Sequence, residues 1–168
     1  MGTKTHKANA PRHIKVGIIS VSTTRSLADD KSGQWIAKRA AKEGHRVVSH
    51  VVVPDAVEAV RQALSEAMDQ SGAQAVLLTG GTGISARDVT IEAVRPMFDK
   101  ELSAFAFLFA QLSFEQIDSA AMLSRATAGI IGLSAVFCMP GSLKACKLAC
   151  KALIFPELGH ILGHVLKG

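Results

Sequence analysis

Cysteine, long uncharged apolar runs and internal repeats are scarce or absent in this sequence. The 168 residues contain three cysteines, Cys138, Cys146 and Cys150. An odd number without Cys-x-x-Cys spacing argues against a disulfide framework and against a zinc knuckle. No uncharged run reaches the roughly 18 residues that a membrane span requires, and no apolar signal region opens the chain. We therefore expect a cytoplasmic protein with reduced, half-buried thiols and no membrane contact.

Basic residues are concentrated at the start of the chain. The formal net charge is +5, and Lys4, Lys7 and Arg12 supply a large share of it. We expect residues 1–12 to form a flexible basic arm and residues 13–168 to form a single domain. Without the arm the chain is close to neutral, and its aromatic residues are not interleaved with Arg or Lys. Both observations argue against a nucleic-acid partner.

Strand-like and helix-like segments alternate along the sequence. Apolar and β-branched runs predict strands within residues 13–22, 46–53 and 73–79. Helical spacing of apolar residues predicts helices at 33–43, 54–72, 90–98, 105–117 and 156–166. Gly132 separates two strand-like pieces, which predicts a hairpin, and a further helix is expected to start near Ser142. The pattern predicts a parallel sheet that is covered by helices and has an antiparallel edge.

A glycine-rich turn, GGTG at residues 80–83, follows the third predicted strand directly. Glycines permit positive φ and allow backbone N–H groups to approach an anion, which suits phosphate binding. The turn lacks the Lys-Ser/Thr of a Walker A loop, and its glycines do not form a dinucleotide fingerprint. The alternative is a turn that only requires positive φ, in which Asp88 is an N-cap and Glu92 interacts with the helix dipole.

Polar residues are predicted to converge at the carboxyl edge of the sheet, where ligands bind in open α/β folds. The residues after the strands are Ser20–Ser22, Asp55, the GGTG turn with Arg87 and Asp88, and the PGS turn at 140–142. Two carboxylates and two glycine turns at one edge are expected of a magnesium-nucleotide site. Arg87 and Lys144 are expected to supply cationic contacts. Asp55 also forms a capping-box-like pair with Glu58.

Three segments, in this order, carry a resemblance to a known family. LLTGGTGISARDVTIEAV, SFEQIDSAAMLSRATAGI and MPGSLKACK resemble the MoaB/Mog family of molybdopterin adenylyltransferases, and SFEQI and PGS-x-KAC resemble its MoaB branch. The resemblance covers about residues 13–155. It implies a three-layer α/β/α sandwich with a mostly parallel sheet and an antiparallel edge. The implied reaction transfers AMP from MgATP to the terminal phosphate of molybdopterin and releases pyrophosphate, in the synthesis of a molybdenum or tungsten cofactor.

The resemblance also implies roles for individual residues. Asp55 and Asp88 fall on the two essential carboxylates of the family and are expected to hold Mg²⁺. The nucleotide phosphates are expected to contact Gly80, Gly81, Thr82 and Gly83. The residues expected on or near the pterin side are Ser124, Pro140, Gly141, Ser142 and Lys144. Ile91 departs from the family, because many members have proline there, and the C-terminal segment FPELGHILGHVLKG does not match the MoaB branch.

The family further implies a homo-oligomer, a trimer or a hexamer, and allows contacts with other molybdenum cofactor enzymes. Phe105, Phe107 and Phe109 are more aromatic residues than one helix face can bury, so some are expected at a subunit interface. Two alternatives to the enzyme stay open. One is a catalytically silent molybdopterin- or nucleotide-binding protein of the same type, and the other is a scaffold built on an enzyme-like fold.

Two surface patterns have simpler interpretations than binding sites. Glu157, His160 and His164 are spaced to lie on one helix face, but no other residue obviously completes a metal site. We expect a solvated face of the terminal helix there. Lys147 and Lys151 continue a helical stripe from Lys144, which is also expected to face solvent.

Overall fold

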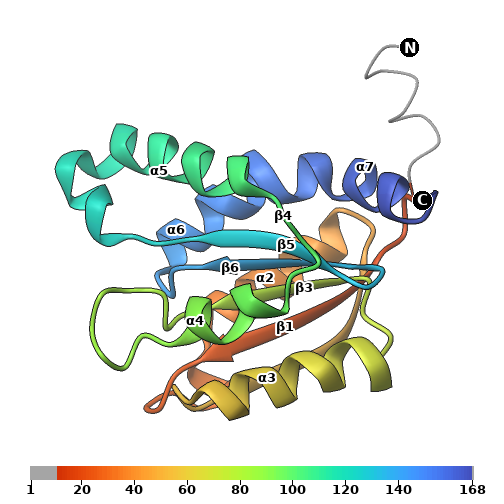
Figure 1. Cartoon of the computed structure of the whole chain (residues 1–168), viewed down its shortest axis with the longest axis horizontal. Helices are drawn as coiled ribbons and strands as arrows, with labels where there is room; N and C mark the ends of the chain where they lie inside the picture. The colour runs from red at the N-terminus through yellow and green to blue at the C-terminus, as the bar shows by residue number, and fades with distance from the viewer. Residues whose placement is uncertain (1–10, 168) are drawn as a thin grey trace.

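The structure is a computed structural model and describes residues 11–167. It is built around one six-stranded sheet, with helices on both faces (Figure 1). Most of the basic arm predicted at residues 1–12 lies outside the described residues, and its flexibility stays a prediction. Within residues 11–167, no helix is long and apolar enough to cross a membrane.

The sheet is mostly parallel, with an antiparallel edge, as predicted. Its strands are β1 (Lys15–Val21), β2 (Arg46–Val53), β3 (Ala75–Thr79), β4 (Lys100–Glu101), β5 (Thr127–Ile131) and β6 (Ser134–Met139). They lie in the order β2-β1-β3-β6-β5-β4. The pairs β1–β2, β1–β3 and β3–β6 are parallel, whereas β5 runs antiparallel to β4 and β6. Gly132, at a φ of +55°, makes the predicted hairpin turn between β5 and β6.

Within residues 11–167, six helices cover the sheet. They are α2 (Lys31–Lys42), α3 (Val57–Ser65), α4 (Thr90–Val94), α5 (Ser103–Ile117), α6 (Leu143–Ala149) and α7 (Phe155–Val165). Short helical turns are η1 (Leu27–Asp29), η2 (Glu66–Gln70), η3 (Arg95–Met97), η4 (Asp118–Leu123) and η5 (Cys150–Ile154). Figure 1 shows α5, α6 and α7 on one side of the sheet and α3 and α4 on the other. The predicted three-layer α/β/α arrangement is therefore confirmed.

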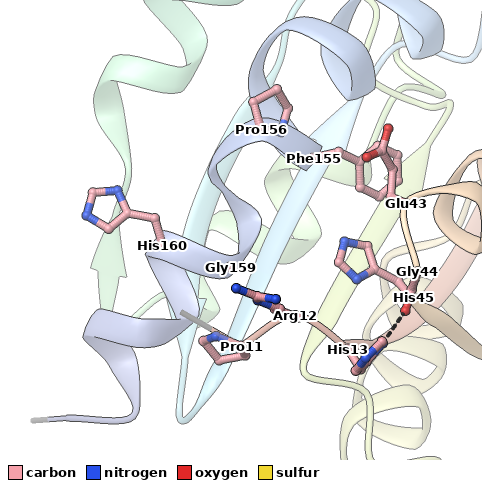
Figure 2. Close-up of a pocket in the computed structure, with 10 residues that line it drawn as sticks. All are labelled: Pro11, Arg12, His13, Glu43, Gly44, His45, Phe155, Pro156, Gly159 and His160. Atoms are coloured by element: carbon pink, nitrogen blue, oxygen red, sulfur yellow. Dashed lines mark hydrogen bonds between the residues drawn. The ribbon is translucent and has the colours of Figure 1, made fainter. Parts of the chain in front are cut away.

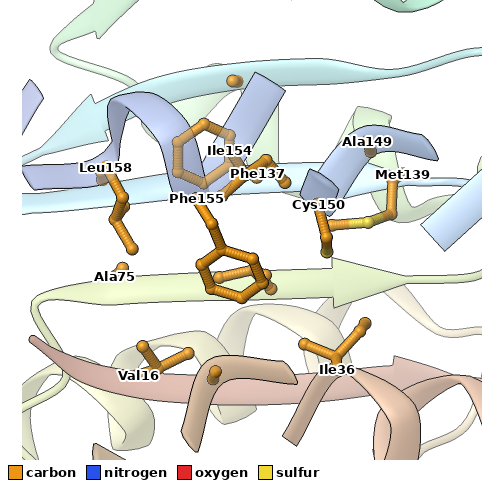
Figure 3. Packing of buried hydrophobic residues seen from close by; sticks show 14 of the residues in the cluster. Val16, Ile36, Ala75, Phe137, Met139, Ala149, Cys150, Ile154, Phe155 and Leu158 are labelled. Carbon is orange, nitrogen blue, oxygen red and sulfur yellow. The ribbon is translucent and has the colours of Figure 1, made fainter. Parts of the chain in front are cut away.

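The core of the described part of the chain consists of two apolar clusters, one on each face of the sheet. Successive residues of β3 alternate between them: Leu77 belongs to the cluster under α2, α5, α6 and α7, and Leu78 to the cluster over α3 and α4. Figure 3 shows Phe155 and Leu158 packed over strands of the first face. Each large side chain buried in this way contributes about 1.5–3 kcal/mol. The unbroken apolar run of β3 reflects burial on both faces.

The three cysteines lie within these clusters. Cys138, Cys146 and Cys150 are fully buried rather than half-buried, and burial raises the pKa of each thiol. They therefore pack as small apolar groups, as predicted for Cys146 and Cys150.

Helix α5 buries only part of its apolar residues. Phe105 and Phe109 are buried, whereas Leu108 is 47% exposed and Phe107 is 77% exposed. The reason is the helical repeat, which directs Phe105, Phe109 and Ser113 toward the sheet and turns Leu108 outward. An apolar surface results, which we call the α5–η4 surface: Phe107, Leu108, Phe114, Ile117, Met122 and Leu123.

The lysine stripe predicted to face solvent, which runs from α6 into η5, also contacts an aromatic ring. The ammonium groups of Lys147 and Lys151 each lie 5.9 Å from the ring centroid of Trp35, which belongs to α2. This distance allows cation–π attraction. The contact depends on the packing of two helices that are distant in sequence.

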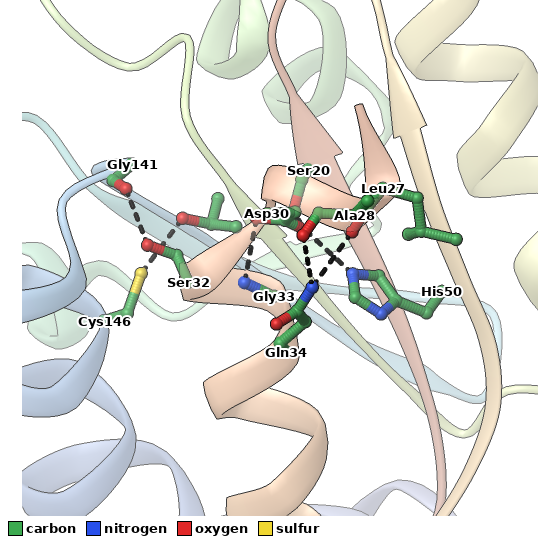
Figure 4. A network of polar contacts seen from close by, with 11 residues as sticks. Ser20, Leu27, Ala28, Asp30, Ser32, Gly33, Gln34, His50, Gly141 and Cys146 are labelled. Atoms are coloured by element: carbon green, nitrogen blue, oxygen red, sulfur yellow. Dashed lines mark hydrogen bonds and ion pairs between the residues drawn. The ribbon is translucent and has the colours of Figure 1, made fainter. Parts of the chain in front are cut away.

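A buried carboxylate, that of Asp30, connects strand β1 to helix α2 and strand β2 (Figure 4). Asp30 is 0% exposed and accepts hydrogen bonds from Ser20 Oγ at 2.5 Å, Gly33 N at 3.0 Å and His50 Nε2 at 2.8 Å. Its bond from Gly33 caps α2. Burial opposes ionisation of this carboxyl, but the three hydrogen bonds outweigh burial, and the pKa of Asp30 is lowered.

We expect Asp30→Asn to lower the free energy of unfolding by about 1–3 kcal/mol at pH 7, because a buried charge-assisted network is broken. Since the folded pKa lies below the unfolded value of about 4, ionised Asp30 stabilises the fold above that pH. This stabilisation is lost as the pH falls through the folded pKa. Urea unfolding at pH 7 and pH 3 should therefore show a smaller difference between wild type and variant at pH 3.

Asp29→Asn is the matched control, because Asp29 is exposed and bonds only locally, accepting from Ser26 Oγ at 2.6 Å. Asp29→Asn should change the free energy of unfolding little at either pH. An Asp30→Asn variant with the stability of Asp29→Asn at pH 7 would contradict the role given to the buried network.

Candidate active site

Four parallel strands end together at one edge of the sheet. Val21 of β1 pairs with Val53 of β2, and Thr79 of β3 pairs with Met139 of β6. The four loops that follow these strands therefore leave from the same edge, and the predicted convergence of strand ends is confirmed. In open α/β sheets this edge is where ligands bind.

The two glycine turns touch each other at this edge. A Cβ atom on Gly141 would lie 3.1 Å from Gly80 Cα. Gly80 has a φ of +96°, and a Cβ there would collide with the carbonyl oxygen of Val21. Gly81 also has positive φ, at +63°, and its Cβ would collide with Thr90 Oγ1. Positive φ and close packing thus both require glycine at these two positions.

Thr90 anchors the first glycine turn through two hydrogen bonds. This buried residue starts α4, and its hydroxyl donates to Gly80 O at 2.8 Å, while its backbone N–H donates to Gly81 O at 2.9 Å. The turn is therefore anchored to the helix that follows it.

Asp55 lies against the first glycine turn but does not cap a helix. Its Oδ2 accepts hydrogen bonds from the backbone N–H and the hydroxyl of Thr23, both at 2.7 Å. Its Oδ1 lies 3.3 Å from the position of a Cβ on Gly81. The predicted capping pair with Glu58 is wrong, because α3 begins after Ala56 without a side-chain cap. Thr23, on the loop after β1, binds the carboxylate instead.

Asp88 lies against the other end of the same turn. Its Oδ2 accepts from the hydroxyl of Ser85 at 2.6 Å and from the Ser85 backbone N–H at 2.8 Å. It lies 2.8 Å from the position of a Cβ on Gly83. The bond from the Ser85 hydroxyl, followed by bonds from the Ser85 and Gly83 N–H groups, lowers the pKa of Asp88. Asp88 is not the N-cap of α4, since that position belongs to Val89.

The second glycine turn is held by side chains from two other elements. Ser142 caps α6 by accepting from Ala145 N at 3.2 Å, so the helix starts where it was predicted. Ser32 Oγ donates to Gly141 O at 2.9 Å, and Thr79 Oγ1 donates to Pro140 O at 3.1 Å. Ser32 belongs to α2, and sequence spacing offers no signal for its contact with residue 141.

The predicted cationic residues lie at the surface. Arg87 is exposed on the loop that carries Asp88, and Lys144 is exposed in the first turn of α6, two residues after Ser142. Lys144 also lines a cavity of about 300 Å³ with Lys147 and Lys151. Their positions are compatible with contacts to a ligand at the sheet edge, and these roles stay predictions.

Ser124 lies in a separate cavity of about 450 Å³, between α4, α5 and β5. The cavity combines polar and apolar walls, including Ser103, Phe107, Arg95 and Arg125. Arg125 connects it to the first glycine turn, because Arg125 Nε donates to Thr82 O at 3.0 Å and to Gly83 O at 2.9 Å. Arg125 belongs to no recognisable catalytic motif, so it was not predicted from the sequence as a site residue.

A further cavity, of about 520 Å³, lies at the opposite edge of the sheet (Figure 2). Its residues His13 and His45 precede β1 and β2, so they lie at the amino ends of the strands, away from the glycine turns. It is therefore not part of the candidate site.

The three polar residues of the terminal helix contact one another. His160 Nδ1 lies 3.0 Å from Glu157 Oε2, and His164 Nε2 lies 3.0 Å from His160 Nε2. Within residues 11–167, no three His, Cys, Asp or Glu side chains are arranged to hold a metal ion. These side chains contact one another along the helix face.

Comparisons with known proteins agree on one family. A family model described as a probable molybdopterin binding domain matches residues 17–160. Molybdenum cofactor biosynthesis protein B of Bacillus cereus is 46% identical over 162 residues, or 96% of each chain. Molybdopterin adenylyltransferase of Pyrococcus furiosus is 44% identical, over 98% of each chain. A crystal structure of a molybdenum cofactor biosynthesis protein B has a TM-score of 0.91 and 43% identity, covering 95% of this chain and 100% of that chain.

The close approach of the Val21 carbonyl oxygen to Gly80 predicts a large loss of stability for a side chain at position 80. Gly80→Ala adds a collision with Val21 O to the strain of positive φ, so it should destabilise the fold by about 1–3 kcal/mol more than strain alone. Gly132→Ala is the control, since it has positive φ but nothing within 4 Å of the new Cβ. It should cost about 1–2 kcal/mol. Equal losses in urea unfolding would show that Val21 does not restrict this turn.

Proposed function

The chain belongs to the MoaB/Mog family of molybdopterin-binding domains, and we propose that it transfers AMP from MgATP to the terminal phosphate of molybdopterin, with release of pyrophosphate. The observation that carries the proposal is the pairing of two carboxylates with one glycine turn. Asp55 lies against Gly81, and Asp88 lies against Gly83. The product would be an adenylylated pterin for the synthesis of a molybdenum or tungsten cofactor.

The glycine turn is suited to hold the phosphates of the nucleotide. Gly80, Gly81 and Gly83 present backbone without Cβ atoms, and Thr82 between them is buried. Thr90 anchors the turn from the helix side. A rigid turn positions two phosphate groups in line at little entropic cost at the moment of reaction. Transfer between two phosphates requires alignment and charge neutralisation, and no nucleophilic Ser or Cys is needed.

The donor set fits a magnesium ion, which favours one or two carboxylates together with phosphate oxygens. Asp55 and Asp88 would hold it. When bound, magnesium would offset the charge of the phosphates and polarise the α-phosphate. Thr23 and Ser85 fix the two carboxylates through hydrogen bonds to one oxygen of each. The lowered pKa of Asp88 keeps this group ionised at neutral pH.

The pterin is proposed to occupy the cavity of about 450 Å³ that contains Ser124. Ser103 would pair with the polar edge of the ring, and the exposed ring of Phe107 offers an apolar wall. The PGS turn and Lys144 would contact the terminal phosphate of the pterin, and Arg87 would contact the nucleotide.

We also propose that the chain forms a homo-oligomer, a trimer or a hexamer, through the α5–η4 surface. This surface gathers six exposed large apolar side chains, including Phe114 and Met122, on consecutive elements. Exposed apolar side chains that gather on neighbouring elements are typical of a protein interface.

Substituting the two carboxylates tests the catalytic proposal. Asp55→Asn and Asp88→Asn should each slow molybdopterin-dependent pyrophosphate release from MgATP by about 100-fold or more, because phosphate charge is no longer neutralised. Asp99→Asn is the control: Asp99 also accepts a backbone N–H, from Gly132 at 2.7 Å, but outside the site. Wild-type rates in both site variants would contradict the proposal. Pterin binding by the wild type without pyrophosphate release would indicate the catalytically silent alternative.

Light scattering after size-exclusion chromatography tests the oligomer. The wild type should show three or six times the chain mass of 17.7 kDa. Phe114→Glu combined with Met122→Glu should dissociate it, because two charges would be buried without partners. Leu133→Glu, at an exposed apolar residue of the β5–β6 turn, should leave the mass unchanged. A monomeric wild type would exclude this interface.

A further inference from the structure

We propose that Arg125 is a positioning residue that holds the first glycine turn in the shape required for nucleotide binding. The inference rests on the proposed function, and it assigns to Arg125 a task that differs from direct contact with the phosphates. Arg125 lies between η4 and β5, more than forty positions after the turn that it binds.

One guanidinium joins three segments of the chain. Arg125 Nε donates to Thr82 O at 3.0 Å and to Gly83 O at 2.9 Å. Its Nη1 and Nη2 donate to the two carboxylate oxygens of Glu92, at 2.6 and 3.3 Å. Glu92 belongs to α4, so the guanidinium fastens the turn to the helix that follows it and to the start of β5.

The two carbonyl groups that accept hydrogen bonds from Arg125 determine the direction of the two N–H groups that follow them. In a trans peptide the C=O and the following N–H point in opposite directions, and the described residues contain no cis peptide bond. With Thr82 O and Gly83 O directed at Arg125, the N–H groups of Gly83 and Ile84 point to the other side of the turn. Asp88 lies on that side and receives the Gly83 N–H. Arg125 thereby directs the Gly83 N–H at the Asp88 carboxylate and the Ile84 N–H to the same side of the turn, so that the turn keeps the shape in which Asp88 is held.

The charge of Arg125 is already neutralised by Glu92. The arginine lowers the pKa of Glu92 through the hydrogen bonds between them, so the pair is an ion pair at neutral pH. A guanidinium with three donor groups in use is poorly suited to bind phosphate as well. Lysine could not replace it, because one ammonium cannot reach two carbonyls and both carboxylate oxygens in this planar arrangement.

The test compares Arg125→Ala and Arg125→Lys with wild type, and uses Arg61→Ala as the matched control. Arg61 Nε also donates to a backbone carbonyl, Ala93 O at 3.0 Å, but outside the glycine turn. Two properties are measured: amide hydrogen exchange of residues 80–88 without ligand, and the KM for ATP and kcat of pyrophosphate release. Arg125→Lys keeps the charge, so it remains informative if Arg125→Ala does not fold.

Both Arg125 variants should show faster exchange across residues 80–88. They should also raise the KM for ATP, with kcat/KM lower by about 100-fold, as expected when reacting groups are misplaced by about 1 Å. Guanidinium ion should partly restore Arg125→Ala. Arg61→Ala should match wild type in all these measurements, although it can lower thermal stability.

Wild-type exchange and wild-type KM in Arg125→Lys would overturn the inference. Loss of thermal stability without a change in exchange at residues 80–88 would also overturn it, since that result describes a merely structural arginine. If the wild type itself releases no pyrophosphate, the proposed function fails, whereas ligand-free exchange still decides whether Arg125 holds the turn.

Discussion

The contact between two glycine turns at the carboxyl edge of the sheet is the constraint on which the site depends. A Cβ atom on Gly141 would lie only 3.1 Å from Gly80 Cα, and a Cβ atom on Gly80 would collide with Val21 O. This approach follows from the parallel pairing of β3 with β6, which ends both strands at the same level. Ser32 and Thr79 then hold the second turn in place. The sheet thus brings two stretches of bare backbone together before any ligand arrives.

The carboxylates of the site are fixed by loops rather than by helices. Thr23 orients Asp55, and Ser85 orients Asp88, in each case with a hydroxyl and a backbone N–H. Each aspartate keeps one side against the first glycine turn. If the turn holds the nucleotide phosphates, as proposed, these fixed negative groups would repel the phosphates unless a cation lay between them, which is the physical reason for proposing magnesium here. Arg125 and Thr90 hold the same turn from its other sides.

Much of the fold could be predicted because its signals are local. The buried run of β3, the glycines at the turns and the cap at Ser142 each follow from a few adjacent residues. The errors concern contacts between distant segments. Asp55 is hydrogen-bonded to Thr23 instead of pairing with Glu58, and the ring of Trp35 contacts the ammonium groups of two lysines. Asp30 and Arg125 were missed for the same reason. The periodicity of a single sequence predicts helices and strands, but it does not indicate which loops pack against each other. The contact between the two glycine turns could therefore be seen only in the assembled sheet.

The central claim is that this chain forms adenylylated molybdopterin. Incubation of the wild type with molybdopterin and MgATP labelled at the α-phosphate, followed by mass spectrometry of the pterin, tests it most directly. The account predicts labelled AMP attached to the terminal phosphate of the pterin, with one pyrophosphate released for each product. Unmodified pterin together with intact ATP, under conditions in which both are bound, would contradict it.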